Sequence, residues 1–337
     1  MPRPPAILAV DGGNSKTDAV LADAAGRVLG SARRIAPSNV GRSNGSLDVL
    51  AEAVGAAARA AGVDPARGPV ARAGMFCLAG ADTPSDERTI ARALGRRGWT
   101  REVDVRNDTA AVLRAGTDRG WGVGLVCGAG MNCIGVGPTG NTARFAALGE
   151  LSGDLAAGGE WIGRAALAAA VRAQDGRGSR TALEVAVPRH FGLARPEAVA
   201  RAMYRERIPS DRLVELPPTV FRAAAKGDRV AREILDRLAD EVAAMATAAI
   251  RRVRLTATDV DVILGGGVFR AGDTAFLGRI RAGIAEVAPE ANVRTLDVPP
   301  LVGALLLALD AAGASAGAHT RARRSFAAAN GTAPKEA

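Results

Sequence analysis

The chain has 337 residues, of which 48% are hydrophobic and only 3% aromatic, so its core must rest mainly on alanine, valine and leucine. This length is sufficient for two domains. The 41 glycines and many short apolar runs favour an α/β protein over a helical bundle. The net charge of +9 does not indicate nucleic-acid binding, because the arginines are scattered over predicted helices and no basic run is interleaved with aromatic residues.

The cysteines and the apolar runs exclude further classes of protein. Cys77, Cys127 and Cys133 form no C-x-x-C pair and there are only two histidines, so neither a disulfide framework nor a structural zinc site is expected. The longest apolar run, residues 301–309, is about half the length of a membrane span. The apolar stretch 7–10 is too short for the core of a signal peptide. We therefore expect a cytoplasmic protein with reduced thiols and no membrane segment.

The first predicted element is a β-meander with a polar first turn, within ILAVDGGNSKTDAVLAD. Two apolar strands flank residues 12–17, and a turn at Ala25-Gly26 leads to a third strand. Glycines let a backbone approach a phosphate closely, while N–H groups and hydroxyls donate hydrogen bonds to it. Asp11, at the end of a strand, is well placed to hold a hydrated Mg²⁺ that bridges phosphate oxygens. An ordinary hairpin turn remains the alternative for D-G-G taken alone.

Helices and strands then alternate, which predicts mainly parallel strands with helices on both faces of the sheet. A helix over 47–62 precedes a strand that ends in the turn Gly80-Ala81-Asp82, and a helix over 87–98 precedes the strand 102–108. Asp108 ends that strand and begins a helix, where the helix dipole favours an ionised carboxylate. Such a carboxylate can accept the proton of an alcohol that attacks a γ-phosphorus. An ordinary helix N-cap is the alternative.

The segment GVGLVCGAGMNCIGVGPTGNTARFAAL, residues 122–148, repeats the opening pattern. It contains a strand, a glycine-rich loop at 128–132, a second strand, a turn at 138–141 and a last strand. Two such meanders predict a duplicated domain in which the two loops face each other across a cleft.

The second half of the chain adds long predicted helices over 161–174 and 230–253, a strand ending at Gly265-Gly266-Gly267, and a closing helix over 302–313. The three glycines leave a surface without side chains on which an adenine or ribose could lie, or they allow a close strand-to-helix crossover. Two polar residues each allow two interpretations. Asp154 could bind a sugar hydroxyl or cap the next helix. Asn39 could be a ligand or an ordinary loop residue. The basic, small-residue-rich tail after Ala316 is expected to be disordered.

Taken together, these motifs have a recognisable order. AVDGGNSKTDAVL, RNDTAAVL, VCGAGMNCIGV, SGD and ILGGGVFRAGD follow the sequence of phosphate, catalytic, second phosphate, sugar and adenosine motifs in the actin/hexokinase/Hsp70 superfamily. Over about residues 6–313 the chain resembles the BadF/BadG/BcrA/BcrD ATPase family, and within it the N-acetylglucosamine kinase branch. The resemblance implies an α/β fold of two actin-like (ribonuclease H-like) lobes with an ATP cleft between them. The implied ranges are 1–118 for the N-terminal lobe, 119–300 for the C-terminal lobe, 301–315 for a closing helix that returns to the first lobe, and 316–337 for the tail.

The resemblance also implies ATP, Mg²⁺ and a small-molecule sugar as ligands, with Asp108 as general base and Asp11 as the residue that holds Mg²⁺ through water. The positions it assigns to ATP are Gly12, Gly13, Asn14, Ser15, Lys16, Thr17, Gly128, Ala129, Gly130, Met131, Asn132, Gly265, Gly266 and Gly267. The positions it assigns to the sugar are Asn39, Gly80, Asn107, Asp108, Gly130 and Asp154. The implied reaction is direct transfer of a phosphoryl group from ATP to the 6-hydroxyl of N-acetylglucosamine or a related amino sugar, and a homodimer is common in the family.

The chain departs from the family pattern near the sugar. Ala129 and Met131 stand where the better-known animal kinases of this branch carry hydroxyl side chains, and the segment after Asp154 lacks an acidic-Gly-Ser sequence. These changes leave the identity of the sugar open. The hexokinase-like ROK branch is disfavoured, because its cysteine-rich zinc motif and its Glu-x-Gly-His element are both absent.

Two other functions keep the same fold. An ATP-driven activator of a radical dehydratase would need two thiolates per subunit for an iron–sulfur cluster, whereas Cys127 and Cys133 flank the phosphate loop and are better explained as small buried hydrophobes. A non-catalytic sugar sensor would have no need of Asp108.

Overall fold

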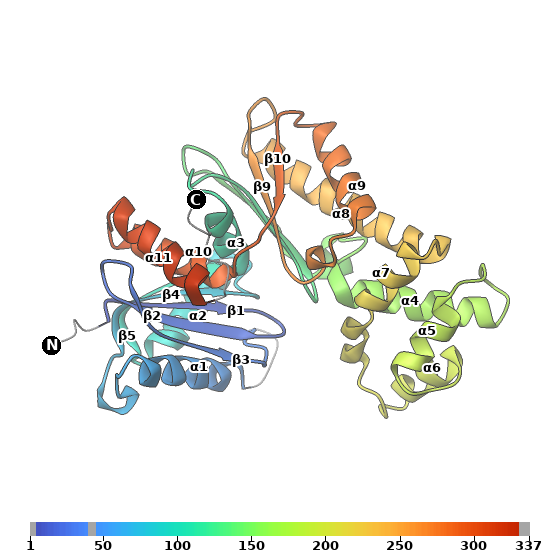
Figure 1. The fold of residues 1–337 in the computed structure, drawn as a ribbon, viewed down its shortest axis with the longest axis horizontal. Coiled ribbons are helices and arrows are strands. Elements are labelled where there is room, and N and C mark those ends of the chain that lie inside the picture. The colour runs from blue at the N-terminus through green and yellow to red at the C-terminus, as the bar shows by residue number, and fades with distance from the viewer. Residues whose placement is uncertain (1–4, 40–44, 330–337) are drawn as a thin grey trace. The chain divides into compact units, whose positions relative to one another are not determined.

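The computed structural model describes residues 5–39 and 45–329 of the chain. These residues form an α/β architecture that contains two five-stranded sheets (Figure 1). They divide into two compact units: the first comprises Met1–Gly124, Val136–Ala146 and Leu296–Ala337, and the second comprises Leu125–Gly135 and Ala147–Thr295. Both units are discontinuous in sequence, because the chain returns to the first unit at Val136–Ala146 and again at Leu296–Ala337, whereas the expected ranges had one return, at 301–315.

The strands form where they were predicted, except the last, at residues 292–295, which was not predicted. In chain order they are β1 Ile7–Gly12, β2 Thr17–Ala22, β3 Val28–Arg34, β4 Ala71–Leu78, β5 Thr100–Asn107, β6 Gly122–Cys127, β7 Met131–Val136, β8 Thr142–Arg144, β9 Asp261–Gly265 and β10 Asn292–Thr295.

The two sheets have the same topology. The first runs β3-β2-β1-β4-β5 and the second, written from the other edge, runs β8-β7-β6-β9-β10. In the first sheet β1 and β2, and β2 and β3, pair antiparallel, while β4 is parallel to both β1 and β5. In the second sheet β9 and β10 are parallel. The predicted duplication of a β-meander followed by parallel strands is confirmed.

Helices cover both faces of the first sheet. They are α1 Ser46–Ala60, α2 Pro84–Gly95, α3 Asp108–Gly116, α10 Pro300–Ala311 and α11 Ala316–Ala329. Alternate residues of β1 point to opposite faces, so Leu8 and Val10 join a core with α1 and α2. Ile7 and Ala9 join a second core with α3, α10 and α11. Because both faces are buried, the strand reads as a continuous apolar run up to Asp11.

The second unit is rich in helices: α4 Gly158–Gln174, α5 Leu183–His190, α6 Pro196–Tyr204, α7 Pro217–Ala225, α8 Arg229–Arg252 and α9 Thr274–Ala285. Helices α4 and α8 correspond to the predicted helices over 161–174 and 230–253, whereas α5, α6 and α7 were not predicted. α4 packs against α5, α6, α7 and α8 (Figure 1). Proline at the first turn of α6 and α7 was the available signal, because proline is favoured where helix N–H groups lack acceptors.

The expectation of a disordered tail is wrong for its first part. Ala316–Ala329 form helix α11, whose Ala318 and Ala322 are buried in the core of the first unit. Small residues at a four-residue spacing allow this helix to pack closely, a pattern that the low-complexity appearance of the segment concealed. The rest of the expected tail, residues 330–337, lies outside the described residues.

Candidate active site

Parallel pairing aligns the ends of three strands in the first unit. Asp11 is in register with Cys77 of β4, and Cys77 is in register with Arg106 of β5. The next residue of β5 is Asn107, and Asp108 follows it at the start of α3. The two carboxylates expected to act in the reaction therefore lie at the same edge of one sheet, near enough for the charge of Asp11 to affect the ionisation of Asp108.

Asp11 is almost completely buried, with 7% of its surface exposed. Its pKa is raised to about 6, mainly by burial; Lys16 and Arg33 lower this pKa and the neighbouring Asp18 raises it, but burial outweighs them. A buried carboxylate with a raised pKa gains free energy from a cation that approaches it. Asp11 therefore fits the predicted role of a residue facing a hydrated metal ion.

Asp18 was not identified from the sequence as a site residue. It lies opposite Asp11 in the β1–β2 pair and is buried. Lys16 donates from Nζ to Asp18 Oδ2 at 2.9 Å, and Arg33 donates from Nε to Asp18 Oδ1 at 2.5 Å. Burial alone would raise the pKa of Asp18, but the bonds from Arg33 and Lys16 lower it overall. Asp18 therefore fixes the Lys16 side chain in the first glycine loop.

Asn107, not Asp108, caps helix α3. The Asn107 Oδ1 atom accepts hydrogen bonds from the Thr109 N–H at 3.0 Å and the Thr109 hydroxyl at 2.6 Å. The Asn107 amide donates to Asp82 Oδ1 at 2.9 Å. The expected N-cap of this helix is therefore present, but Asn107 provides it and Asp108 does not.

The start of the helix favours the ionised form of Asp108, as expected, but burial and neighbouring carboxylates oppose it. The pKa of Asp108 is raised to about 7, mainly by burial and in addition by the charges of Asp11 and Asp82. Hydrogen bonds from the backbone N–H groups of Thr109 and Asp108, at the start of the helix, lower it but are outweighed. Asp82, which the sequence placed only in a turn, is thus part of this acidic group. A carboxyl with this pKa is poised to exchange protons near neutral pH.

The residues expected near the sugar in the first unit also lie together. Asn39 is buried and donates from Nδ2 to Asn14 Oδ1 at 3.0 Å. Gly80 has φ +85°, and a Cβ atom there would lie 2.2 Å from Asn39 Oδ1. A Cβ atom on Gly12 would lie 2.4 Å from the buried Ser38 Oγ. Tight packing therefore joins the first glycine loop to the loop that carries Asn39.

In the second unit, the start of helix α4 supports the loop 128–132. The Gly159 N–H donates to the Gly128 carbonyl at 2.8 Å, and the Glu160 N–H donates to the Ala129 carbonyl at 2.9 Å. The Gly128 N–H donates within the loop to the Gly130 carbonyl at 2.9 Å. Gly158 has φ +76°, and a Cβ atom there would lie 2.5 Å from the Gly130 carbonyl oxygen. The loop is therefore held almost entirely by backbone groups.

The triple glycine lies beside the base of this loop. Gly266 has φ +111°, and a Cβ atom there would lie 2.2 Å from the Cys127 carbonyl oxygen, which also accepts from the Val268 N–H at 3.2 Å.

A pocket of about 550 Å³ opens between α7, α8 and the start of α9. Its lining residues are Phe221, Arg222, Ala224, Ala225, Arg232, Ala271, Gly272, Asp273, Thr274 and Ala275.

Asp154 does not cap the helix that follows it. The N-terminal cap of α4 is Ala157, and Asp154 instead accepts a hydrogen bond from the Ser152 hydroxyl at 2.9 Å. Asp154 is buried, and its charge adds to burial in raising the pKa of Glu241. The leucines around it, Leu148, Leu151 and Leu155, are exposed. Of its two predicted roles, that of a ligand for a hydroxyl remains.

The ranges 5–39 and 45–329 contain no group of three acidic, histidine or cysteine side chains able to enclose a metal ion. Magnesium commonly binds through one or two carboxylates together with water and substrate phosphates, so Asp11 alone fits the expected water-mediated site. Over the same ranges, each helix is too short or too polar to cross a bilayer.

Comparison with known proteins gives a consistent result. Residues 8–308 match the model of the BadF/BadG/BcrA/BcrD ATPase family. An N-acetylmuramic acid/N-acetylglucosamine kinase from Clostridium acetobutylicum is 27% identical over 78% of this chain and 85% of its own length. An N-acetyl-D-glucosamine kinase from Dictyostelium discoideum is 25% identical over 90% of this chain and 98% of its own length.

Solved structures share the fold. A candidate N-acetylglucosamine kinase from Chromobacterium violaceum superposes with a TM-score of 0.68 at 22% identity, covering 90% of this chain and 99% of that protein. A ROK family glucokinase from Streptomyces griseus, in complex with glucose and AMPPNP, gives a TM-score of 0.53 at 20% identity over 90% of this chain and 99% of that protein. At these identities the likeness shows the fold alone, which is that of actin-like sugar kinases.

Proposed function

Because the chain belongs to the BadF/BadG/BcrA/BcrD ATPase family, we propose that it is an ATP-dependent kinase that phosphorylates the 6-hydroxyl of N-acetylglucosamine or a closely related amino sugar. The observation that supports this most directly is the placement of Asp11 and Asp108 at the ends of β1 and β5, with electrostatic coupling between them. The two named relatives are kinases that act on amino sugars of this class.

In this proposal Asp108 is the general base. Its carboxylate accepts the proton of the sugar 6-hydroxyl as that oxygen attacks the γ-phosphorus in line with the departing ADP. The transfer is direct, with no covalent enzyme intermediate. A pKa of about 7 matches the base to neutral pH, since the ionised fraction and the proton affinity are then both substantial.

The first glycine loop and Asp11 serve the phosphates. Residues 12–17 offer backbone N–H groups and the side chains of Ser15, Lys16 and Thr17. Asp11 would hold Mg²⁺ through water, and the bound ion would neutralise charge on the phosphate oxygens.

The second unit serves the rest of the nucleotide. Residues 128–132 offer a loop whose backbone is fixed by α4, suited to phosphate binding by N–H groups. Gly265–Gly267 offer a surface free of side chains, and the pocket beside α7 and α9 has a volume suited to a nucleoside base. Asp154 would hydrogen-bond a hydroxyl of the sugar.

The cysteines disfavour the alternative function as an activator of a radical dehydratase. Cys127 and Cys133 are buried, and burial raises the pKa of both thiols, that of Cys127 to about 12. Two thiols enclosed in the core of one subunit are poorly suited to ligate a cluster shared between subunits. They behave as the small buried hydrophobes that the sequence predicted.

A sugar panel tests the proposal. Release of ADP from ATP and Mg²⁺ is measured with N-acetylglucosamine, glucosamine, N-acetylmuramic acid and glucose, and the product is analysed for the position of the phosphate. Sugar-dependent ADP release, highest with an N-acetylated amino sugar and absent in Asp108→Asn, is expected. Sugar binding without ADP release would instead favour a sensor, and a stable 3- or 4-phosphate product would overturn the assignment of the 6-hydroxyl.

A further inference from the structure

The helix that carries Asp108 is short and is held at both ends. α3 spans only the nine residues Asp108–Gly116. Asn107 caps its first turn. At about 1.5 Å per residue, the last turn of α3 is only about 9 to 12 Å from Asp108 along the axis. A tilt at one end of so short a helix therefore moves the other end as well.

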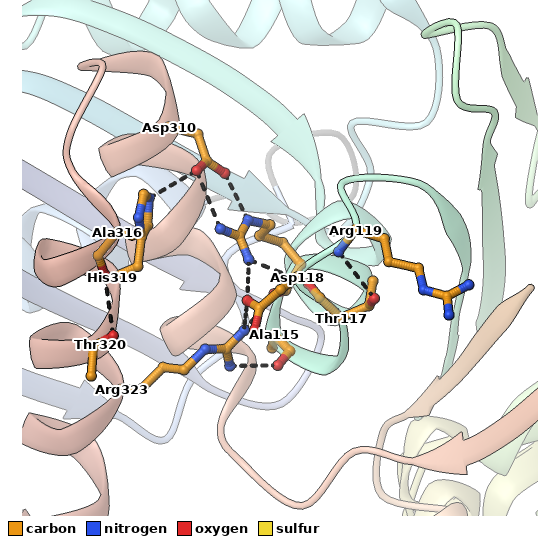
Figure 2. Close-up of polar contacts among 10 residues, drawn as sticks. Ala115, Thr117, Asp118, Arg119, Asp310, Ala316, His319, Thr320 and Arg323 are labelled. Carbon is orange, nitrogen blue, oxygen red and sulfur yellow. Dashed lines mark hydrogen bonds and ion pairs between the residues drawn. The ribbon is translucent and has the colours of Figure 1, made fainter.

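The last turn of α3 is held by helix α11, as Figure 2 shows. Arg323 of α11 donates from Nη1 to the Ala115 carbonyl at 2.8 Å and from Nη2 to the Arg114 carbonyl at 3.4 Å. Arg323 Nη2 also donates to Asp118 Oδ1 at 2.8 Å. The last carbonyls of a helix have no intrahelical donors and carry the negative end of the dipole. A guanidinium is well suited to this end of a helix, because it provides several donors in one plane for the carbonyls and a positive charge that faces the negative end of the dipole.

A second arginine ties α3 to α10. Arg114 donates from Nε to Asp310 Oδ2 at 2.7 Å and from Nη1 to Asp118 Oδ1 at 3.0 Å. His319 Nε2 lies 2.9 Å from Asp310 Oδ1, close enough for an ion pair but without the geometry of a hydrogen bond. Only 11% of the Arg114 side chain is exposed, whereas its partners Asp310 and Asp118 are exposed, so the bonds fix the position of the buried guanidinium more than they add ion-pair energy.

The backbones themselves are in close contact. A Cβ atom on Gly303 of α10 would lie 1.8 Å from the Ala111 carbonyl of α3. On its other side, α11 contacts the turn between β2 and β3, where a Cβ atom on Gly26 would lie 2.1 Å from the Ala318 carbonyl. Arg321 donates from Nε to the Ala25 carbonyl in the same turn at 2.7 Å. α11 thus joins α3 to the meander that carries Asp11.

We propose that Arg323 is a positioning residue for phosphoryl transfer: by binding the C-terminal carbonyls of α3, it holds the helix that presents Asp108 to the acceptor hydroxyl. This role rests on the proposed kinase function. Arg323 binds the end of α3 opposite to Asp108, so its effect on the reaction passes through the orientation of α3. Misplacement of a catalytic group by about 1 Å lowers a rate by about 10²-fold.

The test compares three substitutions in α11. Arg323→Met keeps a long side chain but removes every donor, and Arg323→Lys keeps the charge while losing the planar fork. Arg324→Met is the matched control, because Arg324 is the next residue of the same helix and is exposed. For each variant, kcat, KM for ATP, the thermal midpoint and the amide hydrogen exchange of α1 and α3 are measured on the full chain.

We expect Arg323→Met to lower kcat roughly 10- to 100-fold with KM for ATP changed less than about twofold, and to speed exchange in α3 but not in α1. Arg323→Lys should recover part of the loss, and Arg324→Met should match the wild type. A folded Arg323→Met variant with wild-type kcat would overturn the proposal. So would an equal loss of protection in α1 and α3, because that result indicates general destabilisation.

A wild type without sugar-dependent ADP release would overturn the kinase function and, with it, this role in catalysis. That outcome differs from an active wild type with an equally active Arg323→Met, which overturns the positioning role alone. Hydrogen exchange of α3 reports on the contact itself in either case.

Discussion

The two glycine-rich hairpin loops occupy equivalent places in two sheets of the same strand order, yet they are supported in different ways. The first, residues 12–17, follows a buried carboxylate, Asp11, and its Lys16 bonds to a second buried carboxylate. The second, residues 128–132, follows a buried thiol, Cys127, and is fixed by backbone bonds from α4. The shared topology therefore sets the place of each loop, while the local side chains set its chemistry.

This difference suggests that the two loops contribute different chemistry to the site. Charged groups, whose energies depend strongly on burial, gather on one repeat next to Asp108. The other repeat offers neutral backbone groups, which in the proposed function would bind phosphate without a titrating side chain. Four experiments test this contrast, two directed at the acidic group around Asp11 and Asp108 and two at the loop 128–132.

The largest effect is expected from Asp108→Asn, next to the first meander with its buried carboxylates. Without a base the attacking hydroxyl keeps its proton, so kcat should fall about 10²- to 10⁴-fold, with ATP binding retained. Coupled ADP release and nucleotide titration measure the two quantities. Asp104→Asn is the control, because Asp104 lies on the same strand and pairs with Arg106 at 3.1 Å outside the acidic group. Near-wild-type turnover of Asp108→Asn would end its role as base.

The raised pKa of Asp108 also predicts how the reaction depends on pH. A base must be ionised to act, and the pKa of Asp108 is raised to about 7. As pH falls below that value, kcat/KM should decrease by about tenfold per unit, since only the ionised fraction reacts. The same shift affects stability: the folded protein holds this proton more tightly than the unfolded chain, so the stabilisation it gives at low pH is lost as pH rises from about 4 towards 7.

The pH profile is measured as kcat/KM from pH 5 to pH 9 at saturating Mg²⁺. Asp108→Asn should also be more resistant to thermal unfolding than the wild type at pH 8, because it removes a partly buried charge. A wild-type profile that stays flat down to pH 5 would show that Asp108 titrates normally.

The neutral repeat is tested by Gly158→Ala. The added Cβ would meet the Gly130 carbonyl at 2.5 Å, so the loop must move away from α4. KM for ATP should rise by about tenfold, the effect expected from loss of about one good hydrogen bond to phosphate. Gly176→Ala is the matched control, since Gly176 has φ +81° with nothing within 4 Å of the new atom. Equal effects of the two substitutions would show that strain at positive φ, and not the loop, is responsible.

The smallest effect is expected from Cys127→Ala. If the second loop works through its backbone, removal of the buried thiol should change kcat by less than about twofold and cost about 1 kcal/mol or less of stability, as for loss of one small buried group. Activity and chemical unfolding measure the two effects. Loss of activity in a folded Cys127→Ala variant would indicate that the thiol has a function and would contradict a loop that works through its backbone.

Much of the site could be predicted from the sequence because its parts are local. Alternating apolar residues define β1, glycines define the loops, and Asp11 and Asp108 each end a strand, so parallel pairing had to bring them to one edge. The roles of Asp18 and Asp82 were missed, because each depends on a partner distant in sequence, Arg33 for one and Asn107 for the other.

By itself, the sequence determined the order of the elements, the duplication of the meander and the position of each polar turn, since backbone propensity and apolar periodicity act over a few residues. Only the tertiary structure decided that Asp108 has a raised pKa and that residues 316–329 form a helix against α3. Both depend on desolvation and packing, which arise when distant segments meet. A carboxylate's ionisation and a helix's stability are therefore properties of the surroundings as much as of the residues themselves.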